Sequence, residues 1–343
     1  MEKKETDTCI KWEDVASIFR PSGFHMGVMK CDAELCTQCG LCIENCPFKA
    51  WEADENDVPR LKSDYACFSC YNCMVACPTG AISIGTPYQV DQGSFFETQD
   101  APLEPRMPLD PLDAEGRPDE WTGVERTILE RRSVRNFKSK PVPDHLIRRV
   151  LEAGRFAPSA GNCQPWKFIV VTDTNFIQEM NATLLTLIKM IYATYKDDAT
   201  VKNLLPRYAQ NPKPGSYDPR IILGGIGSIA KGDASAFPEA PVVVLIACDE
   251  RSIGDPNMQA GICGQNMNLA AKALGLGFCW VGFSRVIELV PELKEKLGLA
   301  YPWNICTSAV LGYPKFKQEG MVPREKRPVT WFRSGQKGPV IEP

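Results

Sequence analysis

Histidine is almost missing from this chain, which has 343 residues and only two histidines, His25 and His145. Catalytic triads and most acid–base mechanisms use an imidazole, because its pKa lies close to neutral pH. The scarcity of histidine therefore argues against a mechanism of that kind. Long apolar runs are missing as well, since no stretch approaches the ~20 residues that a membrane-spanning helix needs. We therefore expect no membrane segment.

The chain also lacks an excess of positive charge. It contains 39 Lys and Arg against 42 Asp and Glu, a formal net charge of −3, so no basic surface is expected to hold nucleic acid. The first residues, MEKKETDTC, contain no apolar stretch like that of a secretion signal. Cysteine, by contrast, is abundant, with 15 residues. So many thiols without a signal predict a reducing cytoplasm, in an anaerobic cell.

Eight of the cysteines form one pattern twice. The first copy, CTQCGLCIENCP, begins at Cys36, and the second, CFSCYNCMVACP, begins at Cys67. Each copy reads C-x2-C-x2-C-x3-C-P, the run that holds iron–sulfur clusters in bacterial two-cluster ferredoxins, where the fourth cysteine of each copy ligates the other cluster. The pattern therefore predicts two 4Fe-4S clusters: cluster I held by Cys36, Cys39, Cys42 and Cys77, and cluster II held by Cys67, Cys70, Cys73 and Cys46.

Two other uses of these cysteines fit the pattern less well. Structural zinc sites use pairs of C-x2-C separated by a long gap, with four ligands for each ion, whereas three cysteines at successive x2 steps crowd a single ion. A disulfide framework needs an oxidising compartment. The seven other cysteines form no close pair in the sequence, and Cys248 and Cys263 lie in apolar segments where we expect small buried side chains.

The cysteine repeat is followed by a proline-rich stretch and then by a larger unit. The proline-rich stretch contains six prolines, a density that favours an extended linker over a flexible one. The repeat segment carries eight Asp and Glu against four Lys and Arg, an acidic surface that either steers a redox partner or is simply solvated. The predicted divisions are an N-terminal extension (1–27), a ferredoxin-like domain (28–85), a linker (86–123), a larger domain (124–334) with an insertion or lid at about 181–235, and a tail (335–343).

Helical and strand patterns alternate through the larger unit. Continuous apolar runs are typical of buried strands, and helices are expected where apolar residues recur along one face. The predicted strands are 167–172, 241–248 and 305–311, and the predicted helices are 123–133, 144–157 with Asp144 as N-cap, 258–274 and 284–297. These elements predict an α+β architecture, in which helices surround a mixed central sheet.

A second candidate site lies in the segment RRSVRNF at 131–137. It places Arg131, Arg132 and Arg135 around Ser133. Three guanidinium groups and a hydroxyl within five residues suit an anion with several oxygens, such as a phosphate. A basic group at the end of a helix is also typical of charge complementation of the helix dipole, so this segment alone leaves both interpretations open.

Further motifs follow in a fixed order. APSAGNCQPW at 157–166 stands before a predicted strand, and GLGFCWVGF and LGYP come later. Together with RRSVRNF, they closely resemble the nitroreductase-like flavoprotein superfamily over about 124–334. The resemblance implies a nitroreductase-like FMN-binding domain, preceded here by the small α+β ferredoxin domain. It also implies a homodimer with FMN bound at each subunit interface.

The same resemblance implies roles for individual residues. Backbone groups of Val281 and Gly282 are expected at the flavin ring, although a simple strand-end turn is the alternative. Arg327 fits a second cation at the phosphate, with Lys326 beside it, or else an ordinary surface charge. The FMN phosphate and ribityl chain are assigned to Arg131, Arg132, Ser133 and Arg135, and the flavin of the facing subunit to Pro158, Ser159, Ala160 and Asn162.

The combination predicts an oxidoreductase. Ferredoxin-type clusters pass single electrons and a flavin accepts one or two, so the clusters are expected to feed FMN. The reduced FMN would then reduce a small acceptor, such as a nitro compound, a quinone, an activated alkene or a carbon–halogen bond. Relatives in the family take hydride from a nicotinamide, whereas built-in clusters indicate a one-electron donor such as ferredoxin, with NAD(P)H as the alternative.

Two other functions stay open at this point. FMN could oxidise a substrate while the clusters export electrons, or the chain could be a non-enzymatic electron relay. No catalytic side chain is predicted, because water or a tyrosine can supply the proton. Residues that select the substrate are expected within 181–235, which contains Tyr192, Tyr195 and Tyr208.

One segment imitates a dinucleotide-binding fingerprint. LGGIGSIA at 223–230 contains G-x-G-x-x-A after apolar residues, and Asp249 follows about 20 residues later. The helix that such a site requires would have to cross Gly232 and Pro238, which leaves it too short. A glycine-rich lid over the flavin is therefore favoured.

Overall fold

The computed structural model describes residues 24–63, 65, 67, 69–90, 111–194, 225–324, 329–336 and 338–342. Nearly all of the expected N-terminal extension, most of the linker and residues 195–224 of the expected lid lie outside the described residues. Tyr195, Tyr208, Lys326 and Arg327 lie outside them too. Within the described chain, no helix combines the length and the apolar character needed to cross a bilayer.

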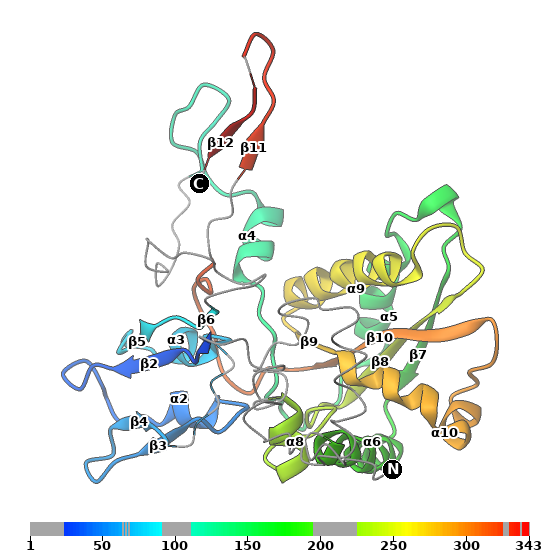
Figure 1. Cartoon of the computed structure of the whole chain (residues 1–343), viewed down its shortest axis with the longest axis horizontal. Helices are drawn as coiled ribbons and strands as arrows, with labels where there is room; N and C mark the ends of the chain where they lie inside the picture. Colours follow the sequence, from blue (N-terminus) through cyan, green and yellow to red (C-terminus); the bar gives the residue numbers. More distant parts are fainter. Residues whose placement is uncertain are drawn as a thin grey trace, which may run out of the picture.

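The cysteine repeat folds into a small lobe made of short elements (Figure 1). Its strands pair antiparallel, β2 with β5, β3 with β4 and β1 with β6. The elements are β1 (Phe24–His25), β2 (Val28–Cys31), α2 (Leu41–Glu44), β3 (Trp51–Ala53), β4 (Pro59–Leu61), α3 (Asn72–Ala76), β5 (Ile82–Thr86) and β6 (Gln89–Val90). The buried core contains Met29, Trp51, Met74 and Ile82 beside two cysteines. A core of this size gives little stabilisation on its own.

The larger lobe is built around a four-stranded sheet in the order β7-β8-β10-β9. The strands are β7 (Trp166–Val171), β8 (Val242–Asp249), β9 (Gly277–Val281) and β10 (Trp303–Gly312). Neighbouring strands pair antiparallel, and a bridge between Ser133 and Phe278 adds a parallel contact at the edge. The α+β fold expected from the sequence is confirmed.

The side chains of β8 alternate between two cores. Val242 and Val244 face a core covered by α5 and α9, whereas Val243 and Leu245 face a core covered by α6, α8, η3 and α10 (Figure 1). Successive side chains of a strand point to opposite faces, so the continuous apolar run is explained by helices on both sides. These helices are α5 (Asp144–Arg155), α6 (Thr174–Thr194), α8 (Gly227–Lys231), α9 (Pro256–Ala273), the 3₁₀ helix η3 (Gly282–Leu289) and α10 (Pro291–Lys296).

Helix α4 (Gly123–Glu130) leads into the segment that carries the arginines. It begins with a capping box, in which Thr122 and Glu125 each accept a hydrogen bond from the other's backbone N–H. It ends three residues before the predicted end, because Arg131 is already extended, with φ −60° and ψ 143°. Figure 1 shows α4 near the C-terminal hairpin of β11 (Val329–Trp331) and β12 (Val340–Glu342).

An extended strap, residues 131–138, follows α4 and runs along the edge of the sheet. The Val134 N–H donates to the Phe278 carbonyl at 3.0 Å, and the Lys138 N–H donates to the Tyr313 carbonyl at 2.8 Å. These bonds fix the strap to β9 and to the end of β10. The arginines of the strap therefore extend from a held backbone rather than from a helix.

Two predicted elements need correction. Asp144, the predicted N-cap of α5, is the first residue of that helix, and Pro143 occupies the cap position. The predicted helix at 284–297 is divided into η3 and α10. The division comes at Pro291, which has no N–H to continue a helix but fits the first turn of a new one.

The expected lid also begins differently. Helix α6 continues through residue 181 as far as Thr194, so the first part of that segment is a regular helix. Met180, Leu184 and Ile188 are completely buried along one face of α6. Their four-residue spacing is a helical core pattern that the sequence already contains.

Gly277→Ala tests the contact between the strap and β9. An added Cβ would lie 2.7 Å from Cβ and from Cγ1 of Val134, which is buried. Overpacking of this kind costs about 1–3 kcal/mol, so the free energy of unfolding in urea should fall by that amount. Gly123→Ala is the control, because an added Cβ there meets nothing within 4 Å. Equal stabilities of the two variants would show that the strap moves aside freely.

Candidate functional site

The small lobe contains two cavities, and each is lined by four cysteines of the repeat. The first is lined by Cys36, Cys39, Cys42 and Cys77, together with Cys31. The second is lined by Cys46, Cys67, Cys70 and Cys73. The structure thus brings together the two sets that the sequence predicts for cluster I and cluster II, including the exchange of the fourth cysteine between the copies.

The chain winds around both cavities in the same way. Residues with a left-handed backbone recur 31 positions apart, as Gln38 and Ser69, Gly40 and Tyr71, and Lys49 and Gly80. The Gln38 N–H donates to the sulfur of Cys36, and the Ser69 N–H donates to the sulfur of Cys67, both at 3.4 Å. Backbone donors of this kind stabilise negative charge on a sulfur.

Three cysteines of the cavities, Cys42, Cys67 and Cys73, are protonated at neutral pH unless a metal replaces the proton. Burial raises the pKa of Cys42 and of Cys67 to about 11, and it raises the pKa of Cys73 well above the usual value. Metal binding releases such protons. In the part of the chain that the structure describes, no three His, Cys, Asp or Glu side chains converge on a single ion. The four sulfurs instead surround a cavity, which fits the corners of an iron–sulfur cubane.

One cysteine pair was not expected. The side chains of Cys248 and Cys306, which are far apart in the sequence, share a hydrogen bond in the structure. The pair arises from strand register, because Cys248 on β8 lies opposite Asn304 on β10. Cys248 and Cys263 are buried, as predicted.

Three arginines of the strap have no ion-pair partner among the described residues. Arg131 Nε, Arg132 Nε and Nη2, and Arg135 Nη1 are buried without a hydrogen-bond partner. Burial lowers the pKa of Arg131, and it lowers the pKa of Arg132 to about 10; the nearby Arg324 guanidinium lowers both further. An unpaired buried cation is unfavourable. Arg131 and Arg132, with Arg324 close to both, therefore fit a bound anion with several oxygens, such as a phosphate, whereas Arg135 lines a different cavity from Arg132.

Arg324 is a site residue that the sequence analysis missed. It lies close enough to Arg131 and Arg132 to depress the pKa of both. It belongs to the segment PREKRP, in which the sequence analysis selected Lys326 and Arg327. Both of these lie outside the described residues, so Arg324 is the cation of that segment that the structure places. Basic composition was the available signal, but spacing could not distinguish the three.

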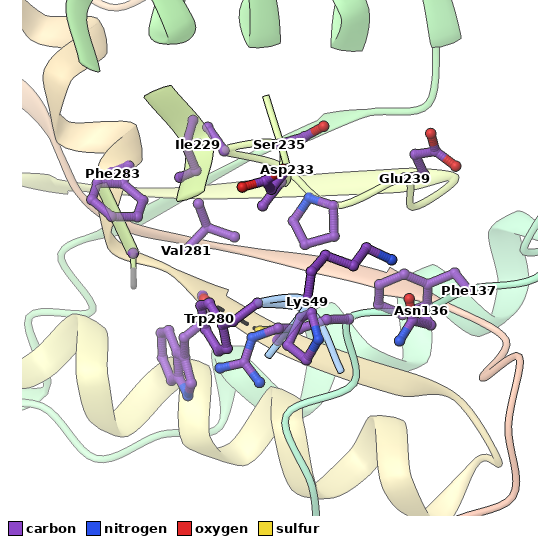
Figure 2. Close-up of a pocket in the computed structure, with 18 of the residues that line it drawn as sticks. Lys49, Asn136, Phe137, Ile229, Asp233, Ser235, Glu239, Trp280, Val281 and Phe283 are labelled. Carbon is purple, nitrogen blue, oxygen red and sulfur yellow. Dashed lines mark hydrogen bonds between the residues drawn. The ribbon is translucent and has the colours of Figure 1, made fainter. Parts of the chain in front are cut away.

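A cavity of about 880 Å³ lies where the two lobes meet. We call it the junction cavity. Its lining residues include Phe48 and Lys49 of the small lobe, Arg135 of the strap, and Val281 and Gly282 at the end of β9. Three of the residues expected at FMN therefore border one space, whose volume is typical of a small-molecule site. Figure 2 shows Lys49 extending into the cavity, with Asp233 on one side and Trp280 on the other.

Pro47 and Phe48 separate the junction cavity from the cysteines of cluster II. Both residues line the junction cavity and also the second cysteine cavity. The Arg135 guanidinium lies over the Phe48 ring, 5.7 Å from its centroid. Burial raises the pKa of Cys279 on β9, an effect that Arg135 opposes and that the nearby Cys70 increases. The cluster II cysteines therefore lie close to both β9 and the junction cavity.

The remaining residues expected at the flavin lie elsewhere in the chain: Pro158, Ser159, Ala160 and Asn162. They belong to a turn with a short 3₁₀ helix, η1 (Ala160–Asn162), whose Ala160 N–H donates to Gln259 Oε1 at 3.2 Å near the start of α9. The strap lies near the other end of α9, where Lys272 pairs with Glu130 at 3.6 Å. The 18 residues of α9 span about 27 Å. One chain therefore does not bring the two groups together, and a shared site needs a second copy.

The sequence profile of the nitroreductase family matches residues 128–313, more than half of the chain. The chain belongs to the nitroreductase family. A second profile, that of the 4Fe-4S dicluster domain, matches residues 35–82. This member of the family therefore has an iron–sulfur domain ahead of the part that matches the family, and it is an oxidoreductase.

Individual relatives match the two parts separately. The chain is 27% identical over 208 residues to the nitrobenzene nitroreductase of Ectopseudomonas oleovorans. This match covers 55% of this chain and 86% of that protein. It is 53% identical over 50 residues to an NADH dehydrogenase of Thermus thermophilus, a match that covers 15% of this chain and 24% of that protein. A solved nitroreductase from Desulfitobacterium hafniense with bound FMN is 25% identical, with a TM-score of 0.44, and covers 60% of this chain and 96% of that chain.

Arg131→Met tests whether the arginines are an anion site. The substitution removes a guanidinium whose buried Nε has no hydrogen-bond partner among the described residues, so the melting temperature of the FMN-free protein should stay the same or rise. Added FMN should raise the melting temperature of the wild type and have much less effect on the variant, because a phosphate contact is lost. Arg251→Met, which removes an exposed arginine paired with Asp249, is the control and should respond to FMN as the wild type does. An equal response of Arg131→Met would exclude this site for the phosphate.

Proposed function

We propose that this nitroreductase passes electrons from a one-electron donor through two 4Fe-4S clusters to FMN, where a small organic acceptor is reduced. One observation carries the proposal: Pro47 and Phe48 line both the cavity of the cluster II cysteines and the junction cavity. An electron that leaves cluster II toward the junction cavity therefore has a single layer of side chains to cross. We also propose a division into a ferredoxin domain (28–85), a linker (86–123) and an FMN domain (124–334), although β1 and β6 of the small lobe pair outside the first of these bounds.

The exposure of the cysteines supports an order for the two clusters. Cys39, assigned to cluster I, is exposed to solvent, whereas none of the cysteines assigned to cluster II is exposed; each set has one buried cysteine, Cys42 and Cys73. The cavity of cluster I shares no described lining residue with the junction cavity. We therefore place the external donor at cluster I and the flavin next to cluster II. A reduced ferredoxin is the proposed donor, with NAD(P)H as the alternative.

The arginines of the strap would hold the FMN phosphate and ribityl chain. The unpartnered nitrogens of Arg131, Arg132 and Arg135 supply donors for it, together with the Ser133 hydroxyl and Arg324. Lys326 and Arg327 stay proposed additions to this group. When bound, FMN supplies the chemistry that joins single electrons into a two-electron reduction.

Other residues would hold the flavin ring. Val281 and Gly282 offer backbone groups at the end of β9, and Arg135 provides positive charge that stabilises developing negative charge in a site shielded from water. A second copy of the chain would contribute Pro158, Ser159, Ala160 and Asn162, which gives a homodimer. The volume of the junction cavity supports binding of an acceptor beside the ring.

The reduction balances without a catalytic side chain. The first step on a nitro group takes two electrons and two protons, and it gives a nitroso group and water. The electrons come one at a time from the donor, and the protons come from water that enters the junction cavity. No histidine is among the described residues that line this cavity, which agrees with the scarcity of histidine in the sequence.

Two alternative functions receive less support. A non-enzymatic relay requires a flavin closed off from small molecules, whereas the described residues leave an open volume of about 880 Å³ next to Trp280. Substrate oxidation with export of electrons uses the same cofactors in the opposite direction. Potentiometry separates the two directions, because cluster potentials well below that of the flavin favour reduction of a substrate.

Cys70→Ser tests the route through cluster II. We expect the anaerobically purified variant to lose about half of its iron and to retain FMN, because no arginine of the strap is changed. Bleaching of the flavin absorbance by a chemically reduced ferredoxin should be abolished, since the cluster next to the flavin is missing. Cys306→Ser, which changes a cysteine outside the repeat, is the control and should keep the wild-type iron content and rate.

Two outcomes would contradict the proposal. Full iron content in Cys70→Ser would remove this residue from the ligands of a cluster. Flavin reduction and acceptor turnover at the wild-type rate with NAD(P)H in the iron-depleted variant would show that the clusters do not lie on the route. In that case the protein would be a hydride-driven nitroreductase, with the clusters serving another purpose.

A further inference from the structure

Three amide side chains connect the small lobe to the strap. Asn136 of the strap donates from Nδ2 to the Asn45 carbonyl at 3.3 Å and to Asn45 Oδ1 at 3.2 Å. Asn72 donates from Nδ2 to the Ser133 carbonyl at 3.3 Å, and Asn45 donates from Nδ2 to the Asn72 carbonyl at 3.3 Å. Asn45 and Asn72 are 2% and 3% exposed. Asn136 is only half-buried and also lines the junction cavity; with Asn45 and Asn72 it forms a continuous amide network between the lobes.

The network is attached to cluster II alone. Asn45 stands immediately before Cys46, and Asn72 stands immediately before Cys73; both cysteines line the cluster II cavity. At the equivalent positions of the other copy, 31 residues away, the chain has Ala76 and Leu41. Neither of these side chains can form a hydrogen bond. Each copy therefore contributes one asparagine to the network, at a position where the other copy has an apolar residue.

A fourth amide extends the network from a distant part of the chain. Gln318 donates from Nε2 to Asn45 Oδ1 at 3.4 Å, and the neighbouring Glu319 N–H donates to the Val75 carbonyl at 3.3 Å. Gln318 Oε1 is buried and has no partner. A buried amide is unfavourable unless it is hydrogen-bonded. The interface therefore buries polar groups, which lose more hydration free energy than apolar groups would. Hydrogen bonds depend on direction, so these groups favour one relative orientation of the two lobes.

We propose that the network of Asn45, Asn72 and Asn136 is the positioning device that holds cluster II at a set separation from the junction cavity. The proposal rests on the function proposed above. The step that it governs moves one electron from the reduced cluster to the flavin, with no bond made or broken. The asparagines act through position, so their loss should slow electron transfer between the lobes while both cofactors stay bound.

Asn136→Ala in the full-length protein tests this proposal, because it removes two hydrogen bonds to Asn45 without changing the small lobe. A chemically reduced ferredoxin serves as donor in anaerobic stopped-flow measurements. Reduction of the clusters should keep the wild-type rate, whereas bleaching of the flavin should slow by about tenfold, the factor that corresponds to about 1.4 kcal/mol of lost docking free energy. Hydrogen exchange of the strap amides should become faster. Iron and FMN contents should be those of the wild type.

Two further variants separate positioning from general destabilisation. Asn304→Ala removes an amide that donates to Glu250 within the larger lobe, and it should leave the flavin bleaching rate unchanged. Gln318→Ala removes the weaker contact to Asn45 and changes no residue that lines the junction cavity. It should slow the bleaching less than Asn136→Ala does. If Asn136→Ala loses iron or FMN, Gln318→Ala decides: slower bleaching with both cofactors retained supports the proposal, and an unchanged rate overturns it.

The remaining outcomes are distinct from a failure of the proposed function. Wild-type bleaching in Asn136→Ala, together with faster hydrogen exchange of the strap, would reduce the network to an ordinary structural contact and overturn the inference. Failure of the wild type itself to pass electrons from its clusters to the flavin would instead overturn the proposed function. Cys70→Ser in the same measurement identifies that case, since its flavin would then bleach at the wild-type rate.

Discussion

The strap of residues 131–138 is held from two sides, and the rest of the candidate site depends on this double attachment. On one side its backbone bonds to β9 and to the end of β10. On the other side the Ser133 carbonyl accepts a hydrogen bond from Asn72 of the small lobe, and Asn136 donates one to Asn45. An extended segment sends successive side chains in opposite directions, so a few residues can meet the sheet, the small lobe and the junction cavity at once. A structural change in the strap therefore affects both lobes.

Both halves of the protein contain groups that are unfavourable as they stand. In the larger lobe, buried arginines crowd together and several of their nitrogens have no partner. In the small lobe, cysteines with raised pKa values line two cavities within a very small apolar core. Cations without a partner fit an anion, and thiols that must lose their protons fit a metal cluster. An FMN phosphate would pair with the buried guanidinium groups, and an iron–sulfur cluster would replace the thiol protons. The two lobes therefore suit these cofactors.

Local spacing explains which predictions succeeded. The grouping of Cys36, Cys39 and Cys42 around one cavity follows from steps of three residues, and β8 follows from an apolar run that is buried on both faces. The errors concern places where packing or adjoining elements, rather than the local pattern, determine the structure. Pro291 divides a predicted helix because it begins a new one, and α6 extends into the expected lid because its buried face packs on the sheet. Arg324 was missed because its contact with Arg131 joins segments almost 200 residues apart in sequence.

The sequence by itself determined the two modules, the ligand spacing of the cysteines and the order of the family motifs, since each of these depends on residues that are close along the chain. Only the tertiary structure decided that the cavity of Cys46, Cys67, Cys70 and Cys73, rather than that of Cys36, Cys39, Cys42 and Cys77, lies next to the junction cavity. It also decided that the strap arginines form no ion pair with an acidic side chain of the described residues, and that the segment from Pro158 to Asn162 lies at the far end of α9. These facts arise from packing between distant segments, and the spacing of residues along a chain does not record which segments will meet.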